Sequence, residues 1–176
     1  MISDERGMTL VEILVAVAIT ALITGTLVTA IYQIYQVTGW GNNEMRVQHD
    51  LQNAATWLNR DVVSASSAEV SGSPGGDSQM VLTIPYFITD TTTLTRTITY
   101  TYTYDPVDGH GDLVRISGSS KVTVARHIGY IAFSATDTVT SAITITITSQ
   151  AGDVTGSATL HLDMRPEPTP TPPASP

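Results

Sequence analysis

Apolar side chains fill the chain from Ile13 to Tyr32, and no charged residue occurs between Ile13 and Asn43. A helix over the first 20 of these residues rises about 1.5 Å per residue and spans roughly 30 Å, the thickness of a bilayer's hydrocarbon core. Further along, one apolar residue recurs every three or four positions, which is the spacing of one helix face: Val47, Leu51, Ala54, Leu58 and Val62. The pattern predicts a long helix with an apolar first half and an amphipathic second half.

Two short segments rich in helix-weakening residues interrupt this pattern. Residues 39–43 contain two Gly and two Asn, and each Gly weakens a helix by about 1 kcal/mol relative to Ala. We therefore expect a kink or a loosened turn there, after which the helix resumes. Residues 71–76, Ser-Gly-Ser-Pro-Gly-Gly, form a cluster of breakers, and we expect the helix to end before it.

Beyond residue 76 the apolar positions alternate with polar ones, a period of two that is typical of strands. Seven short strands are predicted, at residues 80–84, 96–104, 113–116, 122–125, 128–133, 143–148 and 158–164. No helical pattern separates them, so we expect an antiparallel sheet with meander connections. The predicted fold class is therefore α+β, with the amphipathic half of the helix packed on the sheet.

Composition and charge narrow the class of protein. Asp and Glu number 16 against 8 Lys and Arg, a net charge of -8. A nucleic-acid-binding surface needs a basic face to displace counterions from phosphates, so we expect no nucleic-acid partner. The chain has no cysteine, which excludes disulfides, thiolate metal sites and a cysteine nucleophile.

A single carboxylate, Glu12, lies at the start of the apolar segment. That segment has three interpretations: a secretory signal peptide, an ordinary membrane anchor or a specialised leader. A carboxylate in an apolar helix costs about 2.5–3.5 kcal/mol near the bilayer centre and less near its edge, and neither a signal peptide nor a plain anchor uses one. Glu12 therefore favours the specialised leader.

The residues around Glu12 resemble a known processing motif. Arg6, Gly7, Met8, Thr9-Leu10 and Glu12 resemble the cleavage and methylation motif of the type IV pilin family, which usually has Phe where this chain has Met8. The resemblance implies a pilin-like fold. It also implies that a prepilin peptidase cuts between Gly7 and Met8 on the cytoplasmic side and N-methylates Met8.

The patterns and the resemblance together divide the chain into five parts. We expect a leader peptide at residues 1–7, a hydrophobic transmembrane and assembly helix at 8–43, and an amphipathic continuation of that helix at 44–70. An antiparallel β domain at 71–164 and a tail at 165–176 should follow. The tail holds six Pro in twelve residues, so we expect an extended, disordered Pro/Thr spacer.

Residues 51–65 are similar to the second half of the long helix in J-type minor pseudopilins of type II secretion and in W-type minor pilins. The resemblance implies a minor, tip or initiating structural subunit of a type IV pilus-like filament or a type II secretion pseudopilus, with other pilin-like subunits as partners. It implies a single-pass protein of the bacterial inner membrane, with the globular domain outside the cytoplasm, that later enters the filament. The alternative is a pilus-borne binding module, either an adhesin or a DNA-uptake pilin.

We expect Glu12 to be an assembly residue. It is the only charge in the membrane segment, so it must be neutralised, reach the interface or pair with a cation. Cleavage removes Arg6 and creates a positive amine at Met8. The resemblance agrees with a pairing between Glu12 and the Met8 amine of a neighbouring subunit, which would set the axial register of a filament.

No pattern of catalytic residues is found, so we expect neither an enzyme nor a cofactor. The four His lack H-x-x-x-H spacing, and there is no G-x-S-x-G motif. Asp105, Asp108 and Asp112 offer three carboxylates within eight residues and are a candidate calcium site. The same Asp-Pro and Asp-Gly pairs also suit a turn between two strands, and both interpretations stay open.

Overall fold

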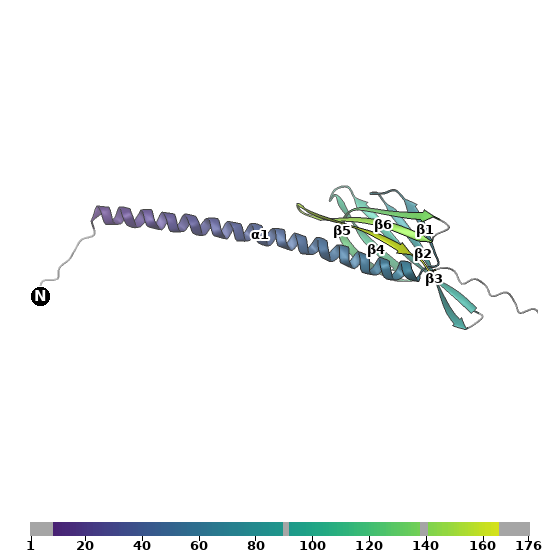
Figure 1. The fold of residues 1–176 in the computed structure, drawn as a ribbon. Coiled ribbons are helices and arrows are strands. Elements are labelled where there is room, and N and C mark those ends of the chain that lie inside the picture. The colour runs from purple at the N-terminus through teal and green to yellow at the C-terminus, as the bar shows by residue number, and fades with distance from the viewer. Residues whose placement is uncertain (1–8, 90–91, 138–140, 166–176) are drawn as a thin grey trace, which may run out of the picture. The chain divides into compact units, whose positions relative to one another are not determined.

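The computed structural model describes residues 9–89, 92–137 and 141–165 (Figure 1). One helix, α1 (Leu10–Ser64), is followed by seven strands that lie in a single antiparallel sheet. The chain divides into two compact units, residues 1–42 and 43–176, so α1 begins in the first unit and ends in the second. The predicted α+β, pilin-like fold class is confirmed.

The sheet is a simple meander, as the absence of helical patterns between the strands predicts. Its spatial order is the chain order, and each strand pairs with the next in antiparallel register. The strands are β1 (Ser67–Gly72), β2 (Ser78–Thr89), β3 (Thr92–Asp105), β4 (His110–Ser117), β5 (Ser120–Asp137), β6 (Ala142–Ala151) and β7 (Val154–Asp163).

The helix differs in two respects from the one that the sequence predicts. It is α-helical through residues 39–43, where we expected a kink or a loosened turn, because extension of an existing helix is cooperative and tolerates isolated weak positions. It also ends at Ser64, so the amphipathic helix expected at 44–70 is six residues too long. From Ser66 the backbone pairs with β2 instead, since the Ser66 N–H donates to the Thr83 carbonyl at 2.8 Å.

The strand count of seven is correct, but two of the strands are not those predicted. β1 was missed, because its last two residues belong to the breaker cluster and five of its six residues are exposed. The strands predicted at 122–125 and 128–133 are one strand, β5. A bulge joins them: pairing with β4 passes from Ala125 to Ile128, and His127 takes the left-handed φ of 53° that such an extra residue needs.

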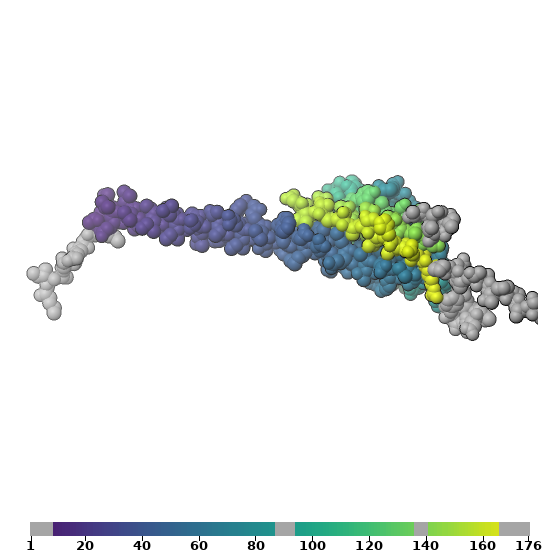
Figure 2. Space-filling model, in the orientation of Figure 1, coloured from purple at the N-terminus to yellow at the C-terminus, as the bar shows by residue number. Residues whose placement is uncertain are grey.

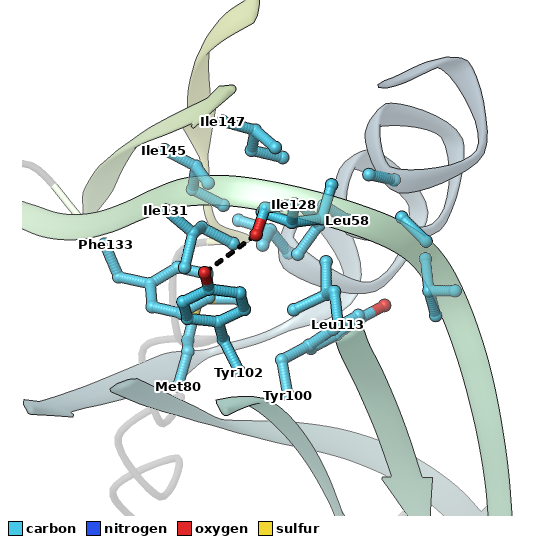
Figure 3. Close-up of a cluster of buried hydrophobic side chains, with 14 of the residues drawn as sticks. Leu58, Met80, Tyr100, Tyr102, Leu113, Ile128, Ile131, Phe133, Ile145 and Ile147 are labelled. Carbon is cyan, nitrogen blue, oxygen red and sulfur yellow. Dashed lines mark hydrogen bonds between the residues drawn. The ribbon is translucent and has the colours of Figure 1, made fainter. Parts of the chain in front are cut away.

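The core lies between the second half of α1 and one face of the sheet. The whole predicted helix stripe is buried: Val47, Leu51, Ala54, Leu58 and Val62. Figure 3 shows Leu58 among buried side chains of β2–β6, including Met80, Tyr100 and Ile145. Tyr102 is also fully buried there, and its hydroxyl donates to the Ile128 carbonyl at 2.8 Å. This packing fixes the second unit as a helix-on-sheet domain.

Two close approaches shape that domain. The sheet curls until the loop after β1 reaches β5, where the Gly75 N–H donates to the Ile131 carbonyl at 3.0 Å. At the other edge, β7 lies along the half of α1 that belongs to the second unit (Figure 2). A Cβ on Gly156 of β7 would lie 2.7 Å from Val47 Cγ1, so only glycine allows the helix to pack this closely.

Candidate processing and assembly site

The start of α1 is built by Thr9 and Glu12. The Thr9 N–H and hydroxyl donate to Glu12 Oε2 at 2.8 and 2.9 Å, and the Glu12 N–H lies 3.4 Å from Thr9 Oγ1 and 3.0 Å from the Thr9 carbonyl. This is a capping box, in which Thr at the helix cap and Glu three residues later satisfy each other's backbone donors. This role of Thr9 and Glu12 was not predicted from the sequence, although the Thr-x-x-Glu spacing is its usual signature.

The predicted cleavage pair, Gly7 and Met8, lies outside the described residues. The described chain begins at Thr9, and α1 begins at Leu10. Glu12 is exposed within its unit. Both bonds from Thr9 reach Oε2, so Oε1 has no partner among the residues that the structure describes. A second donor can therefore approach Glu12 without displacing the cap.

After the cap, α1 presents apolar side chains on every side. All large apolar side chains from Leu10 to Val37 are exposed within the structure. By length and composition α1 qualifies as a membrane-crossing helix, and none of its most apolar 18-residue window is buried. The Thr hydroxyls in this segment bond to the helix backbone, as Thr20 does to the Ala16 carbonyl at 2.8 Å. Such bonding lets Thr lie in an apolar environment.

Comparison with known proteins finds one match, in this same segment. Residues 2–28 match the model of the prokaryotic N-terminal methylation motif. No curated protein and no solved structure matches the chain significantly.

The matched segment and the fold are consistent with one class of protein. The chain carries a prokaryotic N-terminal methylation motif, at the head of a long helix and an antiparallel sheet, consistent with the type IV pilin-like family. The motif implies processing by a prepilin peptidase and assembly with other pilins, and with the apolar helix it indicates membrane anchoring. Proteins of this class are structural and not enzymatic.

The second cluster of functional interest lies where α1 crosses the sheet. Asp61, near the end of α1, is buried and accepts hydrogen bonds from Arg115 Nε of β4, from the Tyr100 hydroxyl of β3 at 2.8 Å and from Arg60 Nε at 3.2 Å. The guanidinium groups of Arg60 and Arg115 lie 4.1 and 5.0 Å from the centre of the Trp57 ring. This cluster was not predicted from the sequence, because no spacing within α1 reveals that Asp61 has a partner 54 residues away.

Electrostatics keep this cluster charged. Burial raises the pKa of the Asp61 carboxyl, but the hydrogen bonds from Arg115 and Tyr100 outweigh burial and hold it below its usual value. Burial and the bond to Asp61 raise the pKa of the Tyr100 hydroxyl, so it stays a donor. The cluster is thus a buried ion pair with each partner hydrogen-bonded, which fastens the helix to strands β3 and β4.

The three candidate calcium ligands lie around the turn from β3 to β4. Asp105 Oδ1 accepts the Val107 N–H at 2.8 Å, and the Asp105 carbonyl accepts the Gly109 N–H at 2.9 Å. Gly109 takes the positive φ of 73° that the turn requires. No group of three or more His, Cys, Asp or Glu within the described ranges is arranged to hold a metal ion. The bonds present at Asp105 and Gly109 are those of a turn between two strands, the second of the two interpretations of this segment.

Proposed function

We propose that this protein is a structural subunit of a type IV pilus-like filament or of a type II secretion pseudopilus. Maturation would cleave the bond between Gly7 and Met8 and N-methylate Met8. The observation that carries the proposal is the direct continuation of the methylation motif into a helix whose large apolar side chains from Leu10 to Val37 are all exposed. Exposed apolar area of this extent needs a cover, which lipid supplies before assembly and neighbouring helices supply afterwards.

The finer assignment follows the resemblance of residues 51–65 to minor pseudopilins and minor pilins. It favours a minor subunit at the tip or at the initiating end of the filament. In this proposal the leader lies in the cytoplasm, the apolar part of α1 crosses the inner membrane once, and the sheet domain lies outside the cytoplasm. Its partners are the prepilin peptidase and other pilin-like subunits.

Glu12 has a specific role in the proposal. In the single chain its carboxylate caps α1 through Oε2, and Oε1 is open with respect to the described residues. A neighbouring subunit's Met8 amine, created by cleavage, can pair with this open oxygen while Thr9 still holds the cap. A subunit at the wrong axial position would leave the carboxylate buried without a counter-ion, which costs several kcal/mol of free energy. Pairing therefore selects one register.

The test compares Glu12→Leu with Glu12→Gln and Thr9→Ala in the native host. Processed protein in membranes and protein in sheared filaments are quantified separately for each variant. Glu12→Gln keeps an acceptor for the cap but has no charge, whereas Thr9→Ala removes the hydroxyl's bonds from the cap and keeps the charge. We expect both Glu12 variants to be processed normally and to enter filaments poorly.

The outcomes separate the roles of Glu12. Normal incorporation of Glu12→Leu would refute the pairing. A defect in Thr9→Ala and Glu12→Leu with normal incorporation of Glu12→Gln would assign the role of Glu12 to the helix cap alone. Failed processing of Glu12→Leu would place its role in recognition by the peptidase.

A further inference from the structure

The face of β2 and β3 that carries the core extends beyond the part that α1 covers. Along this face Leu82 and Ile98 are fully buried and Ile84 is 8% exposed. Further along the same face, two residues past Ile84 and four past Ile98, Tyr86 is 47% and Leu94 is 41% exposed, and these two residues pair across the strands. The hairpin thus carries aromatic and aliphatic side chains past the end of the core.

A groove of about 740 Å³ lies at this place. It is lined by residues of the β2–β3 hairpin and of the turn between β4 and β5: Ile84, Tyr86, Thr95, Arg96, Thr97 and Gly118. Arg96 is exposed and pairs with Ile84 across the hairpin. Among the described residues, the groove therefore combines an apolar wall, one aromatic ring and one cation.

The C-terminal end of the described chain lies close to this groove. The Arg165 N–H donates to the Ala65 carbonyl at 2.9 Å, and the next residue, Ser66, donates its N–H to the Thr83 carbonyl at 2.8 Å. Thr83 directly precedes Ile84 of the groove. The chain after Arg165 thus begins about two strand spacings, roughly 10 Å, from the groove.

The sequence after Arg165 suits such a groove in composition, charge and length. Residues 166–176 include six Pro, and proline-rich segments dock in aromatic-lined grooves because their extended helix loses little entropy on binding. Glu167 is the only charged side chain among them and is opposite in sign to Arg96. Eleven residues at about 3.1 Å each reach roughly 34 Å, enough to cross the hairpin.

We propose that the groove between the β2–β3 hairpin and the β4–β5 turn is a docking site for this chain's own tail, residues 166–176. Proline rings pack on Tyr86 and Ile84, and Glu167 pairs with Arg96. The tail is then a cover for the exposed end of the sheet, and not the independent spacer that its composition alone predicts. The other possible occupant, the tail of a second copy, is distinguished by the test below.

The chain has no cysteine, so the rate of disulfide formation between two introduced cysteines reports their proximity without competing native thiols. In the full chain in detergent, Leu94→Cys with Thr169→Cys joins the groove to the tail, because Leu94 is exposed and lies on the same face of the hairpin as Tyr86 and Arg96. Ser64→Cys with Thr169→Cys is the control, because Ser64 is exposed, adjoins Ala65 and lies outside the groove lining. Under mild oxidation, docking should raise the effective concentration and form the Leu94 link about tenfold faster than the control link, within one chain.

Charge reversal provides a second readout. Arg96→Glu in the Leu94 and Thr169 cysteine pair should slow the link severalfold, and adding Glu167→Lys should restore it. Equal rates for the groove and control pairs, or no response to the charge changes, would overturn the docking site. Links that form only between chains, with a rate that rises with protein concentration, would overturn the intramolecular assignment.

Discussion

Asp61 and Arg115 are the charged residues that the described structure buries, and they pair with each other. A buried ion pair is a weak source of net stability, but removal of one partner leaves a charge with no compensation. Tyr100 and Arg60 satisfy the remaining positions around Asp61. The cluster therefore specifies where α1 sits on the sheet more than it adds to the stability of the fold.

The first prediction at this scale concerns Arg115→Met. The substitution should lower the free energy of unfolding by about 3–5 kcal/mol, because it leaves the Asp61 carboxylate buried without its cation. Chemical denaturation of the detergent-solubilised chain measures this change. Arg46→Met removes an exposed cation from the same unit and should change stability by less than about 0.5 kcal/mol. A small effect of Arg115→Met would mean that Asp61 reaches water.

The second prediction concerns pH. The folded-state pKa of Asp61 is lower than the ordinary value of 3.8, so its contribution to stability is complete above that value. It is lost as the pH falls from 3.8 through the lower folded-state pKa. Asp61→Asn should therefore lower the free energy of unfolding at neutral pH. It should also reduce the further fall of that free energy at acid pH. If the free energy of unfolding falls equally steeply with acid pH in the wild type and in Asp61→Asn, other carboxylates account for that fall.

At the scale of elements, the docked half of α1 is held by a single apolar stripe. Leu58 is fully buried at its centre, whereas Val63 on the same helix is 49% exposed. Leu58→Ala should cost about 2–5 kcal/mol through lost burial and the cavity left behind. Val63→Ala is the matched control and should cost under about 1 kcal/mol. Thermal unfolding followed by near-ultraviolet circular dichroism measures the melting temperature of each variant. Equal decreases in melting temperature for Leu58→Ala and Val63→Ala would contradict the assigned packing face.

The periodicity of the chain was sufficient to predict these elements but not their ends. Helical spacing identified the buried stripe from Val47 to Val62, and alternation identified the meander, because both patterns are local. The end of α1 at Ser64 and the strand β1 depend on pairing with β2, which no local pattern encodes. The Asp61–Arg115 pair and the bulge at His127 were missed for the same reason. At the candidate site, Glu12 was identified by its place in the motif, and its cap partner Thr9 was overlooked.

At the scale of the whole molecule, the core of the second unit is complete without the first. Residues 43–176 form one compact unit that includes the docked part of α1. A fragment of these residues should therefore be a soluble, folded, β-rich monomer, because its apolar faces pack on each other. Analytical ultracentrifugation with circular dichroism checks this. An aggregated or unfolded fragment would mean that the apolar residues before 43 stabilise the sheet domain.

The most direct test of the proposed function is the intact mass of the protein in filaments sheared from the native host. The proposal predicts a chain that begins at Met8 and carries one N-methyl group. Gly7→Val should block this maturation, because a branched side chain does not fit a cleavage subsite for glycine, and should keep the chain out of the filament fraction. A filament-associated chain that retains Met1, or a mature chain that begins near Leu27, would contradict the proposal and indicate a plain anchor or a secretory signal.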